Sequence, residues 1–338
     1  MTMDIQDTKE RIDALLAQHE RRIGAVFRAA IQNVTEPLDL DRIADLIQKG
    51  QLEEALLIPQ QIAAQLGVAA QTAFIGAGLS TASWLTSSGL GAILFDQVNE
   101  RAVGAMRNNT LRLVNEFTAE QRRATKVALL DGIERGLNPR EQARAFRSSI
   151  GLTERQMRAV LNYRRALERV GREGVPRGEQ AEALKRALRD ARSDRSVKRA
   201  MRQMIPLPAD QIDNMVERYR KRYIKYRSEV IARTEALRSV NEGVEEAFRQ
   251  GVEQGSWELT DLERTWDSSG DARVRNSHRY LNGQKKPFGE PWRTSNGVIR
   301  YPGDPNAPAS ETVQCRCVLL TRVKRSSLVG TLSAAQRG

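Results

Sequence analysis

The only two cysteines of the chain stand one residue apart, in Cys315-Arg316-Cys317, and one of its two histidines, His278, lies in the same C-terminal region. A disulfide between such close residues is strained, because the bond requires specific Cα and Cβ spacings. Two thiolates, an imidazole and a nearby carboxylate are together a donor set that suits four-coordinate zinc. The candidate ligands of a zinc ion are therefore Asp271, His278, Cys315 and Cys317. The pattern lacks a second cysteine pair, and the alternative is that these residues only pack and hydrogen-bond within a compact module.

Enzyme motifs are otherwise absent from the sequence. It contains no phosphate-binding Gly-x-x-x-x-Gly-Lys-Ser/Thr loop, no dinucleotide fingerprint and no His-Glu-x-x-His. A cysteine nucleophile could use His278 as its base, but Asp271 is the only evident carboxylate to orient that base. We therefore expect no catalytic residues and no enzymatic activity. The second histidine, His19, is interpreted as a surface residue of the first helix.

The elements that must position the cysteine and histidine residues begin after Gly255, where helical periodicity stops and Pro, Gly, Asn and Trp cluster. Thr265-Trp266, residues 298–301 and residues 318–323 have the composition of short strands, and Asn282-Gly283 is a tight-turn signal. This segment is predicted to be a small α+β module.

Apolar residues at helical spacing predict helices over most of the remaining chain. Asn138-Pro139 and Thr153 have the pattern of helix starts. Tyr219, Tyr223 and Tyr226 form a stripe that indicates a core or a helix partner, although stacking on bases is the alternative. The outer face of that helix is expected to carry Lys221, Arg222, Lys225 and Arg227. The predicted helices span residues 5–33, 39–50, 96–148, 154–203 with a break near 171–178, and 210–254.

The fold class that follows is mainly α, with elongated helical N-terminal and middle regions and a small C-terminal α+β module. We expect a helical N-terminal region over 1–110, which contains the uncharged stretch 55–95 and makes protein contacts. A basic helical region over 111–209 follows, and then a long helix plus the α+β module over 210–325. Residues 326–338 are expected to be a flexible tail.

The charge of the chain is concentrated in its middle. The 338 residues contain 54 Lys+Arg and 42 Asp+Glu, a net charge of +12, and residues 152–240 hold 23 basic and 12 acidic residues, a net +11. Such a belt indicates a polyanionic partner, either DNA or an acidic protein surface, and a solvated helical surface is the alternative. The candidate contact residues are Arg164, Arg165, Lys185, Arg186, Lys198, Arg199, Lys221, Arg222 and Lys225.

Residues 55–95 contain no charged residue. Glutamine, serine and threonine interrupt every window that could span a membrane, so we expect buried helices, with an oligomer interface as one use of their small residues. A membrane-active segment is the alternative. No stable membrane span is predicted.

Several motifs follow one another in the order found in a known family. Ala232-Arg233-Thr234-Glu235 is followed by Trp266, by Asp271, Val274, Arg275 and His278, and by Asn282-Gly283-Gln284; Pro302-Gly303-Asp304-Pro305 and Gln314-Cys315-Arg316-Cys317 close the series. Over about residues 225–323 the chain resembles the Mu-F-like phage head morphogenesis proteins, also called minor head or minor capsid proteins. Many relatives carry Cys in place of His278 and a further Cys two to three residues earlier, which makes a metal site plausible here. Val274 and Arg275 occupy the corresponding positions in this chain.

The resemblance implies a structural minor head protein of a tailed bacteriophage, made in the host cytoplasm and located in the virion near the portal vertex. Such proteins act in head morphogenesis and in DNA packaging or ejection. The implied partners are the portal protein, the major capsid protein, packaged double-stranded DNA bound without sequence specificity, and further copies of the chain. The alternatives are an ejected membrane-interacting protein and an enzyme or toxin-like effector carried in the virion.

The signature residues Arg233 and Glu235 have two interpretations. Glu229–Arg233, Glu235–Arg238 and Arg238–Glu242 are helix neighbours, and each pair would contribute only about 0.2–0.5 kcal/mol. The alternative is that Arg233 and Glu235 anchor the C-terminal module onto the long helix.

Overall fold

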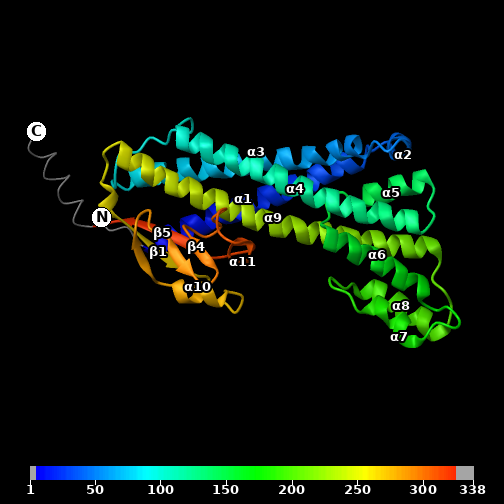
Figure 1. Ribbon diagram of the computed structural model, residues 1–338. Helices are drawn as coiled ribbons and strands as arrows, with labels where there is room; N and C mark the ends of the chain where they lie inside the picture. Colours follow the sequence, from blue (N-terminus) through cyan, green and yellow to red (C-terminus); the bar gives the residue numbers. More distant parts are fainter. Residues whose placement is uncertain (1–4, 325–338) are drawn as a thin grey trace, which may run out of the picture. The chain divides into compact units, whose positions relative to one another are not determined.

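A computed structural model of the protein describes residues 5–324 (Figure 1). Most of these residues are helical, and the strands are confined to residues 262–323. The predicted mainly α fold with a C-terminal α+β module is confirmed. The predicted tail, 326–338, lies outside the described residues.

The helices follow the predicted ranges closely. The breaks near 171–178 and at Pro206-Leu207-Pro208 fall where turn residues interrupt the helical pattern, and short 3₁₀ turns cover Ala181–Leu184 and Leu259–Asp261. The α-helices of the described residues are α1 (Ile5–Thr35), α2 (Leu40–Gln48), α3 (Leu52–Ser87), α4 (Glu100–Glu134), α5 (Pro139–Ser149), α6 (Glu154–Arg169), α7 (Arg177–Gln180), α8 (Ala191–Gln203), α9 (Ala209–Glu253), α10 (Asn276–Leu281) and α11 (Ala309–Thr312).

Two helix starts are fixed by capping boxes. The side chain of Asn138 accepts a hydrogen bond from the backbone of Glu141 at 3.0 Å, and Glu141 accepts one from the backbone of Asn138 at 2.9 Å. Thr153 and Gln156 repeat this reciprocal arrangement at the start of α6. Both boxes satisfy backbone N–H groups that the first turn of a helix leaves unpaired. The two starts predicted from the sequence are therefore confirmed.

Two compact units make up the chain, and each is assembled from separated segments. Within the described residues, the first unit comprises residues 5–26, 66–112 and 229–324, and the second comprises residues 27–65 and 113–228. Both units contain residues of α1, α3, α4 and α9.

In the first unit, residues of α1, α3, α4 and α9 share an apolar core with the strands. Phe74 and Phe95 pack beside Phe248, Trp257 and Phe288 in this cluster. The helices α3 and α9 approach so closely that a Cβ at Gly243 would lie 2.3 Å from the carbonyl oxygen of Phe74. A residue larger than glycine would therefore force the two helices apart.

The strands of the first unit form two small antiparallel sheets. Strands β2 (Lys285–Pro287), β1 (Leu262–Asp267) and β5 (Val318–Val323) make one sheet in this order, and β3 (Trp292–Thr294) pairs with β4 (Gly297–Ile299). Trp266 lies opposite Leu319 in the register. Trp266, Trp292 and the two cysteines belong to one buried cluster between these sheets and Leu237 of α9.

The second unit has an aromatic core of its own. Tyr219 packs edge-on against Tyr163 and Tyr223, with ring centroids 4.8 and 4.9 Å apart. Tyr219 and Tyr223 of the stripe therefore pack in the core, as predicted. Tyr226 does not, because its side chain is exposed. The expected outer position of Arg227 is wrong: it is buried, with its guanidinium 5.2 Å from the ring centroid of Phe117, and burial lowers its pKa to about 10.

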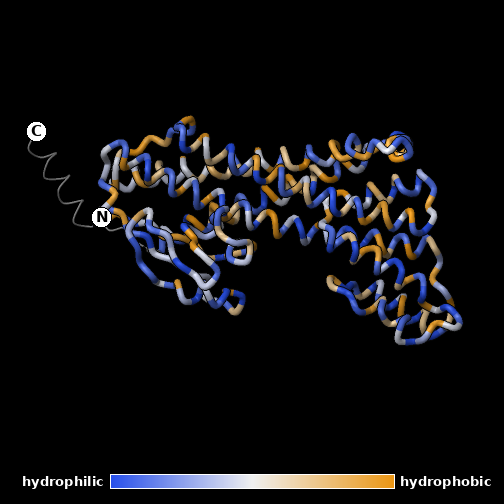
Figure 2. The backbone as a smooth tube through the Cα atoms, in the orientation of Figure 1, coloured by the Kyte–Doolittle hydropathy of each residue, from blue (hydrophilic) through white to orange (hydrophobic). Residues whose placement is uncertain are grey.

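The uncharged stretch 55–95 forms a single helix, α3, and the loop after it rather than several helices. In Figure 2, α3 carries more orange and white than blue. By length and composition α3 could cross a membrane, but 56% of its apolar window is buried inside the protein. Ala73 and Ala77 are fully buried, whereas Val68 and Leu79 are exposed. The helix is thus buried along one side, as predicted for a core helix.

The interpretation of His19 as a surface residue is wrong. His19 is 4% exposed, and its ring lies 3.3 Å from where a Cβ at Gly76 would stand. Burial lowers its pKa, and the nearby Arg22 lowers it further. The glycine at position 76 opens the space that the imidazole occupies, and this pairing between distant segments has no local signal.

Candidate metal centre

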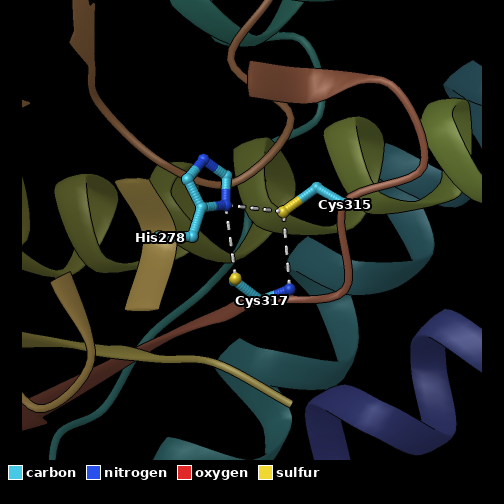
Figure 3. A group of neighbouring side chains, drawn as sticks. All are labelled: His278, Cys315 and Cys317. Atoms are coloured by element: carbon cyan, nitrogen blue, oxygen red, sulfur yellow. Dashed lines mark hydrogen bonds between the residues drawn. The ribbon is translucent and has the colours of Figure 1, made fainter. Parts of the chain in front are cut away.

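The structure brings together His278, Cys315 and Cys317, three of the four predicted metal ligands (Figure 3). His278 comes from α10, and the two cysteines come from the segment that leads into β5. Nδ1 of His278 lies 3.4 Å from each sulfur, and the three donor atoms all lie within 4.8 Å of one another. All three side chains are buried, at 1%, 3% and 2% exposure.

These distances fit a shared zinc ion. Zn–S bonds of about 2.3 Å and Zn–N bonds of about 2.0–2.1 Å at a tetrahedral angle place nitrogen and sulfur roughly 3.6 Å apart. The observed 3.4 Å lies near that value. It also fits a hydrogen bond between the imidazole and a thiol, so the packing alternative has the same geometry. The donor set therefore offers three ligands, and a fourth would come from outside the three residues.

The carboxylate behind the imidazole is Glu311 of α11, which was not predicted from the sequence. Its Oε2 lies 2.7 Å from Nε2 of His278, although off the direction of the ring N–H. Burial would raise the pKa of Glu311, but hydrogen bonds from Asn296 at 2.5 Å and Ser277 at 3.0 Å, with His278 nearby, hold that pKa below its ordinary value. An ionised Glu311 favours the proton on Nε2 and leaves the Nδ1 lone pair facing the sulfurs, the arrangement of a metal-ligating histidine.

The two thiols titrate as a coupled pair. The pKa of Cys315 is lowered well below its ordinary value, chiefly because the Cys317 thiol donates to it, with His278 adding to the effect. The same contact raises the pKa of Cys317, and burial raises it further. The cluster therefore holds a first thiolate readily, and a second requires a cation to replace the shared proton.

Asp271, the fourth predicted ligand, lies outside the cluster. Its Oδ2 is 2.6 Å from Nη1 of Arg316, the residue between the two cysteines. Asp271 is therefore engaged by an arginine and is not part of the group of donor atoms. The sequence identified the residue but could not give the direction of its side chain.

A cavity of about 270 Å³ adjoins the cluster within the first unit. Cys315 and Arg316 line it together with Asp13, Glu20 and Arg233. Cys315 is the cluster residue through which this space is reached, so a fourth ligand or a modifying reagent would approach from there.

Three residues of α9, within or just after the Ala232–Glu235 motif, hold the loops of the module against this helix. Arg238 donates to the carbonyl oxygen of Gly303 at 2.9 Å, and Asn241 donates to that of Pro302 at 3.0 Å. The hydroxyl of Thr234 accepts from the backbone N–H of Gln314, next to Cys315, at 3.2 Å. Helix α9 is therefore anchored to the module, but through Thr234, Arg238 and Asn241 and not through the predicted Arg233 and Glu235.

Arg233 and Glu235 form contacts that differ from both interpretations, the ion-pair ladder along α9 and the anchor for the module. Arg233 pairs with Glu20 of α1 at 3.1 Å rather than with Glu229. Glu235 is buried between Arg112 at 2.7 Å and Arg238 at 2.8 Å. Only the Glu235–Arg238 pair of the predicted ladder is present, and it orients the guanidinium that reaches Gly303.

The remaining signature residues shape the turns near His278. The side chain of Asn282 accepts from the backbone of Ser268 at 2.8 Å, and the N–H of Gly283 donates to the carbonyl of Trp266 at 2.8 Å. The Trp266 ring in turn packs edge-on to His278, with centroids 5.2 Å apart. Asp304 accepts hydrogen bonds from both the backbone and the side chain of Arg300.

The predicted DNA-contact residues all lie in the second unit, where acidic side chains neutralise several of them. Arg164 pairs with Asp213, Arg165 with Asp131, Lys185 with Glu182 and Arg186 with Asp194. The side chain of Arg186 is only 6% exposed and lies over Tyr163, so its expected contact with DNA is not compatible with this placement. Two further predicted residues form longer ion pairs: Arg222 lies 3.8 Å from Asp190, and Lys221 lies 4.0 Å from Glu217. The predicted residues that remain exposed, with no carboxylate within 4.0 Å among the described residues, are Lys198, Arg199 and Lys225.

Comparison with known proteins gives one result that bears on function. Residues 165–320 match the family model described as phage Mu protein F like protein. The match includes α9, the cluster and the module as far as the first half of β5, and it confirms the resemblance predicted from the motifs. This family consists of phage head-related proteins with structural or morphogenetic roles. No curated protein and no solved structure matches the chain.

Proposed function

We propose, on the basis of the phage Mu F-like region at residues 165–320, that the protein is a minor structural component of a tailed-phage head. In this proposal it associates with the portal at one vertex and acts in head morphogenesis and in DNA packaging or ejection. The observation that carries the proposal is the family match over residues 165–320. Within the matched region, the hydrogen bonds of Thr234, Arg238 and Asn241 hold the module against α9, and such contacts suit a structural role.

Association with the portal is tested by co-expression with the portal protein encoded in the same genome. Tagged portal protein should retain this chain through a purification at moderate salt, and the major capsid protein serves as the second bait. Failure of both baits to retain a folded chain would contradict the proposed partners.

The proposal includes contact with packaged duplex DNA through cations of the second unit. The exposed Lys198 and Arg199 of α8 and Lys225 of α9 support it, because exposed cations attract phosphates additively. Retardation of duplex DNA should weaken steeply as salt increases. A complete lack of retardation at low salt would contradict this part of the proposal.

We also propose that His278, Cys315 and Cys317 hold a zinc ion, with Glu311 orienting the imidazole. The ion would join α10 to the segment before β5 and so add to the stability of the module. Thiolates would carry the charge that balances the cation, and the imidazole would bind through Nδ1.

An ejected membrane-interacting protein is the alternative that α3 favours by its length and composition. Liposome flotation separates the two functions. Val68→Asp places a charge on the exposed side of α3, whereas Ala77 is fully buried and would report only on folding. Flotation of the wild-type protein that Val68→Asp abolishes would support the membrane function over the head function.

A thiol-dependent effector is the alternative that the cluster itself favours. Cys315, His278 and Glu311 follow one another as a nucleophile, a base and an orienting carboxylate would. Against it, Cys317 lies equally close to Nδ1, and Cys315 is only 3% exposed. Rapid alkylation of Cys315 in the metal-free and zinc-loaded protein alike would favour the effector; protection by zinc would favour the metal centre.

A further inference from the structure

A second cavity, of about 680 Å³, lies in the second unit among α1, α5 and α9. We propose that this cleft binds backbone phosphates of DNA, and the inference rests on the proposed contact with packaged DNA. Its volume falls within the range of ordinary ligand sites, about 300–1,000 Å³. Thirteen residues line it, of which six are cationic and two are acidic; the cations are Arg28, Arg144, Arg147, Arg220, Lys221 and Lys225.

The charge of the cleft is not neutralised by the protein. Within residues 5–324, Arg28, Arg144, Arg147 and Lys225 have no carboxylate within 4.0 Å, and the two acidic residues of the lining are Glu36 and Glu217. Arg28 instead donates to the hydroxyl of Ser228 at 3.1 Å. An anion in the cleft would therefore gain attraction from several unpaired cations at once.

Several cations of the belt predicted from the sequence are paired with carboxylates, unlike most cations of the cleft. Arg164, Arg165, Lys185 and Arg186 each have a carboxylate partner. Their contribution to the net charge is therefore balanced nearby. Four of the six cleft cations, on three helices that are distant in sequence, have no carboxylate within 4.0 Å in the described part of the chain.

Arg220 forms a fixed part of the cleft wall. Its Nε donates to the carbonyl oxygen of Ser148 at 2.7 Å and its Nη2 to that of Ile150 at 3.2 Å, which satisfies acceptors at the end of α5. The only carboxylate that the structure places within 4.0 Å of this buried guanidinium is the partly exposed Glu217, at 3.3 Å. Burying a charge is costly, and because Glu217 is itself partly exposed, a phosphate in the cleft would add to the compensation of this charge.

The lining favours phosphates over an acidic protein surface. Ile31 and Ile224 are its only apolar residues, and it contains no aromatic side chain. Protein–protein interfaces usually centre on aromatic or apolar anchors, whereas protein–DNA interfaces are more polar and more positively charged. Four arginines also match the forked geometry with which guanidinium groups bind phosphate. The missing aromatic residues indicate contact with the backbone rather than stacking on bases.

The test compares two triple variants of the full chain in retardation of a 30-base-pair duplex over a series of salt concentrations. The cleft variant is Arg144→Gln/Arg147→Gln/Lys225→Gln, and the matched control is Arg42→Gln/Lys126→Gln/Arg155→Gln, which changes exposed cations of α2, α4 and α6 outside the cleft lining. Each set removes three positive charges from side chains without a carboxylate within 4.0 Å in the described part of the chain. If the cleft variant does not fold, Arg144→Gln/Lys225→Gln changes only exposed residues and replaces it.

We expect the cleft variant to reduce the slope of log affinity against log salt by about 2–3, since each phosphate contact contributes about 0.9. The control should reduce the slope by less than about 1. Wild-type binding with equal loss in both variants, or with loss only in the control, would overturn the cleft and leave the proposed DNA contact standing. A wild-type protein that fails to bind at low salt would overturn both. Polyglutamate binding that the cleft variant alone loses, with DNA binding intact, would assign the cleft to an acidic protein instead.

Discussion

Arg238 of α9 donates from Nε to the carbonyl oxygen of Gly303 at 2.9 Å, across 65 positions of sequence. Gly303 adopts a φ of +89°, and a Cβ at this position would lie 3.0 Å from the backbone nitrogen of Arg238. The contact therefore depends on the residue types on both sides. On α9, Glu235 orients the arginine that reaches the loop. In the loop, a glycine permits the backbone to approach this closely.

Replacement of Arg238 by alanine should strongly destabilise the protein. Arg238 and Glu235 are each 7% exposed in their side chains, so the variant leaves a buried carboxylate with Arg112 as its remaining partner. Removing one member of a buried pair costs about 3–5 kcal/mol. Urea unfolding would measure it, with Arg158→Ala, a member of an exposed pair with Glu154, as the control expected to cost about 0.5 kcal/mol or less. Equal costs for both variants would show that the anchor adds nothing.

A matched pair of glycine variants separates backbone strain from close approach. Gly303 and Gly289 have φ values of +89° and +90°, but nothing lies within 4 Å of a Cβ at Gly289. Gly289→Ala should cost about 1–2 kcal/mol through strain alone, and Gly303→Ala should cost more because the backbone of α9 must also move. Thermal unfolding of the two variants would test this, and a larger loss in Gly289→Ala would refute the close contact as a constraint.

The ion pair of Asp304 should make stability depend on pH. Burial would raise the pKa of Asp304, but its hydrogen bonds with Arg300 hold that pKa below the ordinary value. A carboxylate with a lowered folded-state pKa stabilises the fold fully above its unfolded pKa of about 3.9, and this stabilisation is lost as the pH falls through the folded value. The wild type should therefore exceed Asp304→Asn in unfolding free energy at pH 5–7, with the gap closing below about pH 4. A gap that stays constant from pH 3 to 7 would contradict this assignment.

The metal centre predicts about one zinc per chain in protein purified without chelators. Cys317→Ser should lose the metal, because it removes one of three ligands, whereas Asp271→Asn should retain it, because Asp271 pairs with Arg316 outside the cluster. Elemental analysis measures the content, and a chelator should lower the unfolding temperature of the wild type but not of Cys317→Ser. Zinc near zero in the untreated wild type would leave only the packing role for the three residues.

The features that the sequence predicts well in this protein depend on residues that are close to one another in the chain. Asn138 and Thr153 mark helix starts because their caps involve residues three positions away. The cysteines and His278 are identifiable because rare residue types stand in one module. Glu311 is not identifiable in this way, since one carboxylate among many gains its role only when α11 packs beside α10.

Burial of polar side chains is the property that sequence patterns predicted least well here. His19 and Arg227 were both expected at the surface, yet one fills the space beside Gly76 and the other lies over Phe117. The basic belt shows the same limit. Its net charge is correct, but the distribution of carboxylates decides which cations stay unpaired, and this depends on tertiary structure.

The composition of purified phage particles tests the central claim most directly. Quantitative mass spectrometry of virions produced from the genome that carries this sequence should detect the chain at a low copy number relative to the major capsid protein. It should remain with the heads after tails are removed, together with the portal protein. Heads that contain the portal and capsid proteins but lack this chain would contradict its assignment as a structural head protein.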